Sequence, residues 1–161
     1  MTEKLPPIII DRRDYARLEG LAANALRERH PVSGFLMSEI QRAVVCDTHS
    51  MSRGVASLNG WVTYRVDGSN EAESRILVCP DEFRSARINL SVLSPLGAAI
   101  LGMSVGDRMK FVGIDGGLHV VIVESLGAPA SAPLLFPLKP RRAARQVAIE
   151  PSGPDDGPSA A

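Results

Sequence analysis

Two hydrophobic periods follow one another along this chain, and the change between them constrains the fold more than any other feature. Up to about residue 44, apolar side chains recur every three or four residues, which is typical of amphipathic helices. After residue 60 the period becomes two: Val62, Tyr64 and Val66 alternate with more polar neighbours, as in a half-buried strand. Helices followed by a separate run of strands predict an α+β protein.

The N-terminal part, residues 5–46, is predicted to be a short antiparallel helical hairpin. Asp11 is a suitable N-cap for a first helix over about residues 12–29, and Pro31 with Gly34 ends it. Ser33 is expected to cap a second helix whose apolar positions run to Val44. Residues 8–10, three isoleucines, fit either a short strand or an apolar lead-in. Helices of this length are not stable alone, so the two are expected to pack against each other.

Residues 55–126 are predicted to form an antiparallel β-sheet domain with one short helix, joined to the hairpin by a polar linker over residues 47–54. Ser94 is a suitable cap, Pro95 fits the first helical position, and Gly102 fits the left-handed position after a helix. Alternation and turn signals place the strands at residues 61–66, 75–78, 88–93, 108–112 and 118–123.

Composition limits both the folded region and the function. The 161 residues carry 18 Lys+Arg and 18 Asp+Glu, so a protein that wraps nucleic acid along its whole surface is not expected. The aromatic share of 4% is too low for a base-stacking surface. Residues 127–161 are rich in Pro, Ala, Ser and Gly, which predicts disorder. This tail holds a basic cluster, Lys139, Arg141, Arg142 and Arg145, which suits at most a weak nucleic-acid contact.

No catalytic residue, metal site or cofactor is predicted. Phosphate-cradling glycine loops and nucleophile elbows are missing from the sequence. Cys46 and His49 have metal-ligand spacing, but a zinc site needs three or four ligands, and His30, Cys79 and His119 are scattered. Two cysteines give no disulfide framework, and the N-terminus lacks a signal-peptide run, so a cytoplasmic protein without a membrane span is expected.

Residues 88–111 carry a motif that resembles a known family. The chain is similar to the C-terminal domain shared by the Gre transcript-cleavage factors and the regulator of nucleoside diphosphate kinase, the Rnk family. The likeness covers roughly residues 5–126 and rests on Ser91-Val92, Ser94-Pro95-Leu96-Gly97, Ala99-Ile100-Leu101-Gly102 and Gly106-Asp107, with Pro7-Ile8-Ile9-Ile10-Asp11, Val62 and Leu77-Val78-Cys79-Pro80 upstream.

This resemblance implies an FKBP-like β-domain that docks at the rim of the RNA polymerase secondary channel, with the helical hairpin directed toward the channel. The implied polymerase-binding residues are Leu93, Ser94, Pro95 and Leu96. An alternative from the residues themselves is that Ser94 and Pro95 only begin a helix whose apolar side chains are core. The nucleoside diphosphate kinase link is implied by the family name alone.

The hairpin tip separates the two sister families. Gre factors carry a long coiled coil whose tip holds paired acidic residues for a catalytic Mg²⁺. Here the first helix spans about 27 Å, and its tip is Arg27, Glu28, Arg29 and His30. A single carboxylate between arginines is a poor Mg²⁺ ligand set, so a short basic tip favours an Rnk-type regulator without cleavage activity. The arginines alternatively only solvate the hairpin end.

Two other functions stay open at this point. A peptidyl-prolyl isomerase is suggested by the implied fold alone, and its aromatic pocket has to come from one Trp, two Tyr and four Phe. A nucleic-acid-binding module that uses the basic tail is the other, which the net charge of zero disfavours. We expect a monomer that regulates transcription through RNA polymerase.

Overall fold

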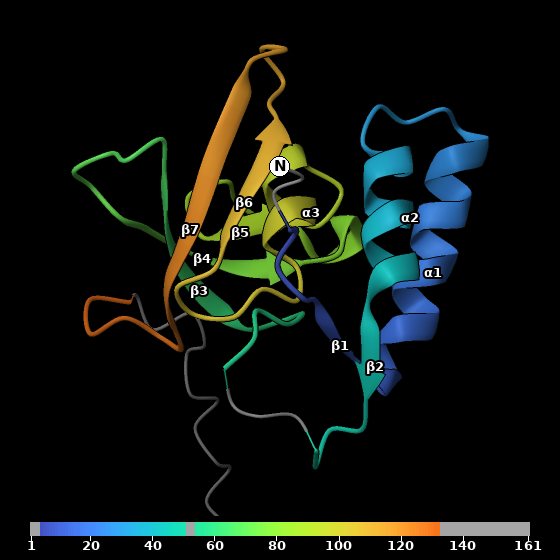
Figure 1. The fold of residues 1–161 in the computed structure, drawn as a ribbon, viewed down its shortest axis with the longest axis horizontal. Coiled ribbons are helices and arrows are strands. Elements are labelled where there is room, and N and C mark those ends of the chain that lie inside the picture. Colours follow the sequence, from blue (N-terminus) through green and yellow to red (C-terminus); the bar gives the residue numbers. More distant parts are fainter. Residues whose placement is uncertain (1–3, 51–53, 133–161) are drawn as a thin grey trace, which may run out of the picture. The chain divides into compact units, whose positions relative to one another are not determined.

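The computed structural model describes residues 4–50 and 54–132, and all of these except Ala132 belong to one compact unit, residues 1–131. Two helices come first, α1 (Arg12–Arg27) and α2 (Ser33–Arg42), flanked by the short strands β1 (Ile9–Asp11) and β2 (Val44–Cys46). A five-stranded sheet with a short helix follows, as the ribbon shows (Figure 1). The predicted α+β class is therefore confirmed. The expected tail and its basic cluster fall almost wholly outside the described residues.

The helical hairpin forms for the reasons that the sequence suggests, with three differences in detail. Asp11 caps α1, because its carboxylate accepts a hydrogen bond from the backbone N–H of Arg13 at 2.9 Å. Ser33 is the first residue of α2 and not its cap; its hydroxyl donates to the His30 carbonyl oxygen. The first helix ends at Arg27, two residues earlier than expected.

The third difference is that Val44 lies in a strand. Residues 44–46 pair in parallel with residues 9–11, so the isoleucine run contributes to strand β1 and α2 stops at Arg42. Helical spacing alone misses this, since an apolar residue after a helix suits either element. The pairing ties the chain before α1 to the chain after α2.

The large sheet has the strand order β5-β4-β3-β7-β6. Its strands are β3 (Trp61–Val66), β4 (Glu73–Val78), β5 (Asn89–Ser91), β6 (Arg108–Val112) and β7 (Leu118–Leu126). Three of the pairings are antiparallel, as predicted, but β5 lies parallel to β4, so the sheet is mixed.

The parallel pair is possible because the chain turns back between β4 and β5. Pro80 starts a 3-10 turn, η1 (Pro80–Glu82), and the buried Asn89 side chain accepts hydrogen bonds from the backbone N–H groups of Arg84 and Ser85. This connection carries the chain from the end of β4 at Val78 back to a point beside Ile76, so that β5 runs in the same direction as β4. Alternation predicts which face a strand buries but not its direction.

Helix α3 (Pro95–Ile100) links the sheet to the N-terminal elements. Gly102 follows it with φ +76°, the predicted left-handed conformation. Its missing side chain also lets Ile8 approach, because a Cβ there would lie 1.9 Å from a methyl group of Ile8. A continuous hydrophobic core results, shared by both helices, α3 and the sheet. No helix in the described ranges is long and apolar enough to cross a membrane.

Candidate functional site

A groove of about 670 Å³ lies where three segments distant in the sequence meet. The first segment contains the α1–α2 loop and the start of α2, the second precedes α3, and the third is the β6–β7 hairpin. The lining residues are His30, Pro31, Val32, Phe35, Leu93, Ser94, Pro95, residues 110–114 and Leu118. Figure 1 shows the β6–β7 tip and the α1–α2 loop at the same end of this unit. We call this feature the groove.

The corner before α3 supplies residues that the sequence singled out. The Ser94 hydroxyl donates to the carbonyl oxygen of Ser91 at 2.6 Å and accepts from the N–H of Gly97 at 3.0 Å. Its hydrogen-bonding capacity is thus used inside the turn, and Pro95 occupies the first helical position. Leu93 and Pro95 line the groove at this corner and Leu96 does not, although Leu93 and Leu96 both pack against the core.

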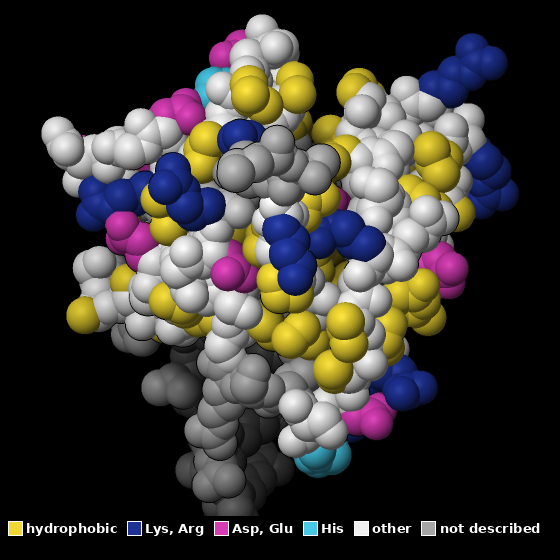
Figure 2. Space-filling view, in the orientation of Figure 1, with side chains coloured by type: hydrophobic (Ala, Val, Ile, Leu, Met, Phe, Trp, Pro, Cys, Tyr) yellow, Lys and Arg dark blue, Asp and Glu magenta, His cyan; other side chains and the backbone are white. Residues whose placement is uncertain are grey.

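The β6–β7 hairpin supplies the most exposed apolar surface of the groove. The Ile114 side chain is 94% exposed, and Val112 and Leu118 are 59% and 68% exposed. Figure 2 shows hydrophobic side chains gathered at the tip of this hairpin, at the top of the view. Clustered exposed apolar side chains of this kind mark interaction surfaces. Sequence reasoning missed them, although an isoleucine inside the turn Gly113-Ile114-Asp115-Gly116 was a usable signal.

The tip of the helical hairpin formed by α1 and α2, residues 27–30, lies partly at the groove and partly in solvent. His30 lines the groove, and its Nδ1 atom accepts a hydrogen bond from the Val32 N–H at 3.2 Å. Arg27, Glu28 and Arg29 are exposed and do not line it. Arg29 has φ +55°, and the Arg27 guanidinium bonds to Asn24 on its own helix. No second carboxylate accompanies Glu28 in the four-residue tip 27–30.

A three-residue bridge holds the β6–β7 tip. Asp67 lies in the turn after β3, and Asp115 lies in the turn between β6 and β7. His119 contacts Asp67 through Nδ1 at 2.6 Å and Asp115 through Nε2 at 2.9 Å. Hydrogen bonds to these two carboxylates raise the pKa of His119 above its ordinary value. The same contacts lower the pKa of Asp67 and of Asp115.

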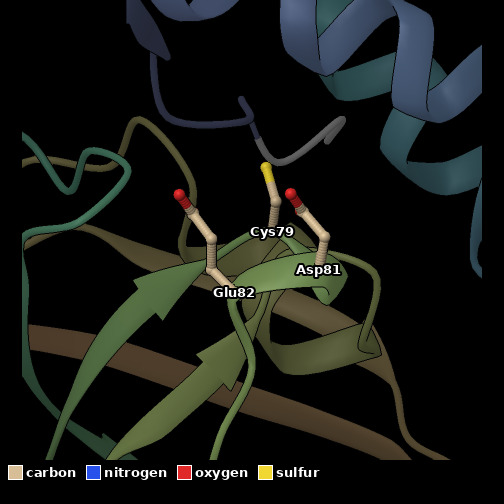
Figure 3. Close-up of side chains that lie close together, drawn as sticks. All are labelled: Cys79, Asp81 and Glu82. Carbon is tan, nitrogen blue, oxygen red and sulfur yellow. The ribbon is translucent and has the colours of Figure 1, made fainter.

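A second cluster contains a cysteine and two carboxylates. Within the described part of the chain, Cys79, Asp81 and Glu82 are the group of three whose ligand atoms come within 4.8 Å of one another, and Figure 3 shows their side chains projecting to one side of η1. Arg17 of α1 binds both carboxylates, at 3.2 Å and 3.3 Å. Burial also raises the pKa of the Cys79 thiol, which opposes formation of the thiolate that a metal needs. The two carboxylates of this cluster therefore form ion pairs with Arg17, which join η1 to α1.

Within the described ranges, the aromatic residues do not assemble the pocket that a peptidyl-prolyl isomerase requires. Phe35 and Phe111 line the groove, but Trp61 lines a different hollow beside Asp11 and Leu126. Tyr64 is buried, and its hydroxyl donates to Glu73. The groove is thus an open apolar surface with two phenylalanine rings.

Comparisons with known proteins agree with this architecture. The family model described as "Transcription elongation factor, GreA/GreB, C-term" matches residues 51–125, and the model described as "Rnk N-terminus" matches residues 6–45. Each matched region contributes residues to the groove: His30 to Phe35 lie in the second, and the α3 corner and the β6–β7 hairpin lie in the first.

Individual proteins show the same two relationships. The chain is 32% identical over 129 residues to the "Regulator of nucleoside diphosphate kinase" of Escherichia coli (strain K12), which covers 79% of this chain and 94% of that protein. It is 29% identical over 101 residues to the "Transcription elongation factor GreB" of Pasteurella multocida (strain Pm70), or 63% of each chain.

A solved structure extends the likeness to three dimensions. The "Prokaryotic transcription elongation factor GreA/GreB from Nitrosomonas europaea" superposes with a TM-score of 0.61 at 30% identity, over 75% of this chain and 99% of that one. The two matched regions and the relative that aligns over nearly its full length show that the chain belongs to the Rnk family, whose C-terminal domain is shared with the Gre transcription factors.

Proposed function

We propose that this protein is a cytoplasmic transcription regulator that docks on RNA polymerase at the rim of the secondary channel. The observation that carries the proposal is the groove: the corner at Leu93 to Pro95 and the exposed tip of the β6–β7 hairpin form a common apolar surface. Burying an exposed leucine or isoleucine contributes about 1.5–3 kcal/mol to association. A protein partner of partly apolar surface is therefore the occupant that this groove suits.

The second part of the proposal is that the protein does not stimulate transcript cleavage. Helix α1 has 16 residues and α2 has 10, so the longer helix measures about 24 Å. The tip presents Arg27 and Arg29 around Glu28, where a hard cation requires several oxygen ligands. A hairpin of this length and charge occupies the channel entrance without delivering a metal to the active centre. The proposal includes a link to nucleoside diphosphate kinase regulation, which rests on the relative's name alone.

Binding to core RNA polymerase tests the proposal directly. We expect the purified protein to co-elute with core polymerase at micromolar concentration when DNA and RNA are both absent. Pro95→Asp is expected to weaken that binding, because it replaces an apolar contact of the corner with a charge. The helix should persist, since aspartate is acceptable in the first turn of a helix.

The control is the same substitution at Pro80, which begins η1 and does not line the groove. Pro80→Asp should leave binding unchanged, and circular dichroism should show that both variants keep the wild-type spectrum. Failure of the wild-type protein to co-elute would contradict the proposed function.

A further inference from the structure

The exposed tip of the β6–β7 hairpin has to keep a fixed position if the groove is to present a preformed surface. We propose that His119 is the positioning residue of this surface: by bridging Asp67 and Asp115 it fixes the hairpin tip, so that docking weakens when the imidazole loses its second proton. The inference rests on the proposed polymerase docking and adds to it a residue and a pH dependence.

The fixed end of the bridge is Asp67. Its backbone N–H donates to the Val120 carbonyl oxygen at 2.8 Å, and its Oδ1 accepts from the Val120 N–H at 2.9 Å. The residue has φ +52°, a left-handed conformation that aspartate tolerates better than most side chains. Asp67 is thereby attached to strand β7, and its remaining oxygen, Oδ2, is directed at His119.

The movable end is Asp115, which lies in the turn next to Ile114. The turn itself is closed by short backbone bonds, from the Gly113 N–H to the Gly117 carbonyl oxygen and from the Gly116 N–H to the Gly113 carbonyl oxygen. The Nε2 contact of His119 is the side-chain link between this turn and the body of strand β7. Without it, the residues around Ile114 would be held by the backbone bonds of the turn and by the β6–β7 pairing that ends at Val112 and Leu118.

Space for the bridge is provided by a glycine. A Cβ at Gly113 would lie 2.6 Å from Oδ1 of Asp115 and 2.7 Å from Cδ2 of His119, closer than unbonded atoms approach. The imidazole also lies beside the ring of Phe111, its cross-strand neighbour, with centroids 5.5 Å apart. Phe111 lines the groove, so the bridge adjoins the proposed docking surface.

The chemistry of imidazole makes the bridge depend on protonation. A neutral ring has one N–H, so one of the two carboxylates would then face a lone pair; the imidazolium ion donates to both. The charged groups that face His119 are Asp67 from the turn after β3 and Asp115 from the β6–β7 turn. Of the nearby cations, Arg65 on β3 binds Glu124 and the Ser69 carbonyl oxygen, and Lys110 on β6 lies opposite Val120.

The directions of the three pKa shifts define the pH range in which the bridge is complete. The pKa of His119 is raised above its ordinary 6.5, so its contribution is full below 6.5 and is lost as the pH rises through the higher folded value. The pKa of each aspartate is lowered below its ordinary 3.8, so their contribution is present above 3.8 and is lost only as the pH falls through the lower folded values. The bridge is therefore intact between these limits and weakens on the alkaline side.

The free protein provides the first test, without polymerase. We expect an NMR titration to give His119 a pKa above 6.5, and amide hydrogen exchange to accelerate at residues 113–118 in His119→Gln compared with the wild type at pH 6. The control is His49→Gln, at an exposed loop position, which should leave exchange of those amides unchanged. Unchanged exchange in His119→Gln would overturn the inference, whatever the polymerase assay shows.

The second test measures affinity for core polymerase from pH 6 to pH 8.5. The wild type should bind more weakly as the pH rises, with log Kd changing by at most about one per pH unit because a single proton is involved. His119→Gln should bind weakly throughout. His119→Arg should bind well throughout, because a guanidinium donates to both carboxylates and keeps its charge; the His119 side chain is 25% exposed, which leaves room for it.

The comparison between variants separates the two proposals. Polymerase groups that titrate affect the wild type and His119→Gln alike, so the difference between their profiles belongs to His119. His49→Gln, at the exposed loop position outside the groove, should keep the wild-type slope. Parallel profiles for the wild type and His119→Gln would overturn the inference alone, whereas no binding of the wild type at any pH would overturn the proposed function and with it this role of His119.

Discussion

Gly97→Ala is expected to destabilise the protein by about 3 kcal/mol, as an overpacked core position does. A Cβ at this position would lie 1.9 Å from the carbonyl oxygen of Ser91 and 2.7 Å from its carbonyl carbon. Both contacts are to backbone atoms, so no side chain can rotate away. Helix α3 would have to move from the turn at Ser91, and the Ser94–Gly97 cap would be lost with it.

Urea unfolding followed by circular dichroism measures this effect, and Gly20→Ala provides the matched control. Gly20 lies inside α1 with nothing within 4 Å of its added Cβ, so alanine there should be neutral or stabilise by up to about 1 kcal/mol, its advantage in helix propensity. Equal stability of the Gly97 variant and the wild type would show that the α3 corner is not packed as described.

Ile114→Ser combined with Leu118→Ser is expected to lower the affinity for core RNA polymerase about a hundredfold. Each removed side chain contributes about 1.5 kcal/mol when it is buried in an interface, and 1.4 kcal/mol corresponds to a tenfold change in Kd. Because both side chains are largely exposed in the free protein, the free energy of unfolding should scarcely change. Fluorescence anisotropy of labelled protein, titrated with core polymerase, measures the affinity.

Val105→Ser is the control for this pair. Val105 is 51% exposed, comparable with Leu118, but does not line the groove. It should bind polymerase as the wild type does. If the double variant also binds with wild-type affinity, the β6–β7 tip is not part of the docking surface.

Local signals in the sequence were sufficient for most elements. Asp11, Ser94, Pro95 and Gly102 each lie at the helix boundary that their side chains favour, because capping and left-handed geometry depend on a few adjacent residues. The alternation of apolar and polar residues located β3, β6 and β7, because this pattern also depends on adjacent residues. The direction of β5 and the pairing of β1 with β2 depend on contacts between distant residues, which periodicity does not encode.

The candidate site was predictable only in part. The motif at residues 93–95 supplied the corner, and His30 was among the hairpin-tip residues, but nothing in the sequence places these beside Phe35 or Ile114. Their proximity results from the packing of α2 against α3 and of β6 against α3. The bridge at His119 was missed likewise, because Asp67 lies 52 residues away and the sequence suggested only a histidine on a sheet face.

Inhibition of a Gre factor is the most direct test of the central claim, that this protein occupies the secondary-channel rim without cleaving. A backtracked transcription complex is mixed with a Gre factor, this protein is titrated in, and the RNA is resolved on a gel. We predict no cleavage with this protein alone and a progressive loss of Gre-dependent cleavage as its concentration rises, while the Ile114→Ser, Leu118→Ser variant leaves that cleavage intact. Faster cleavage with this protein alone, or unchanged Gre-dependent cleavage at saturating protein, would contradict the claim.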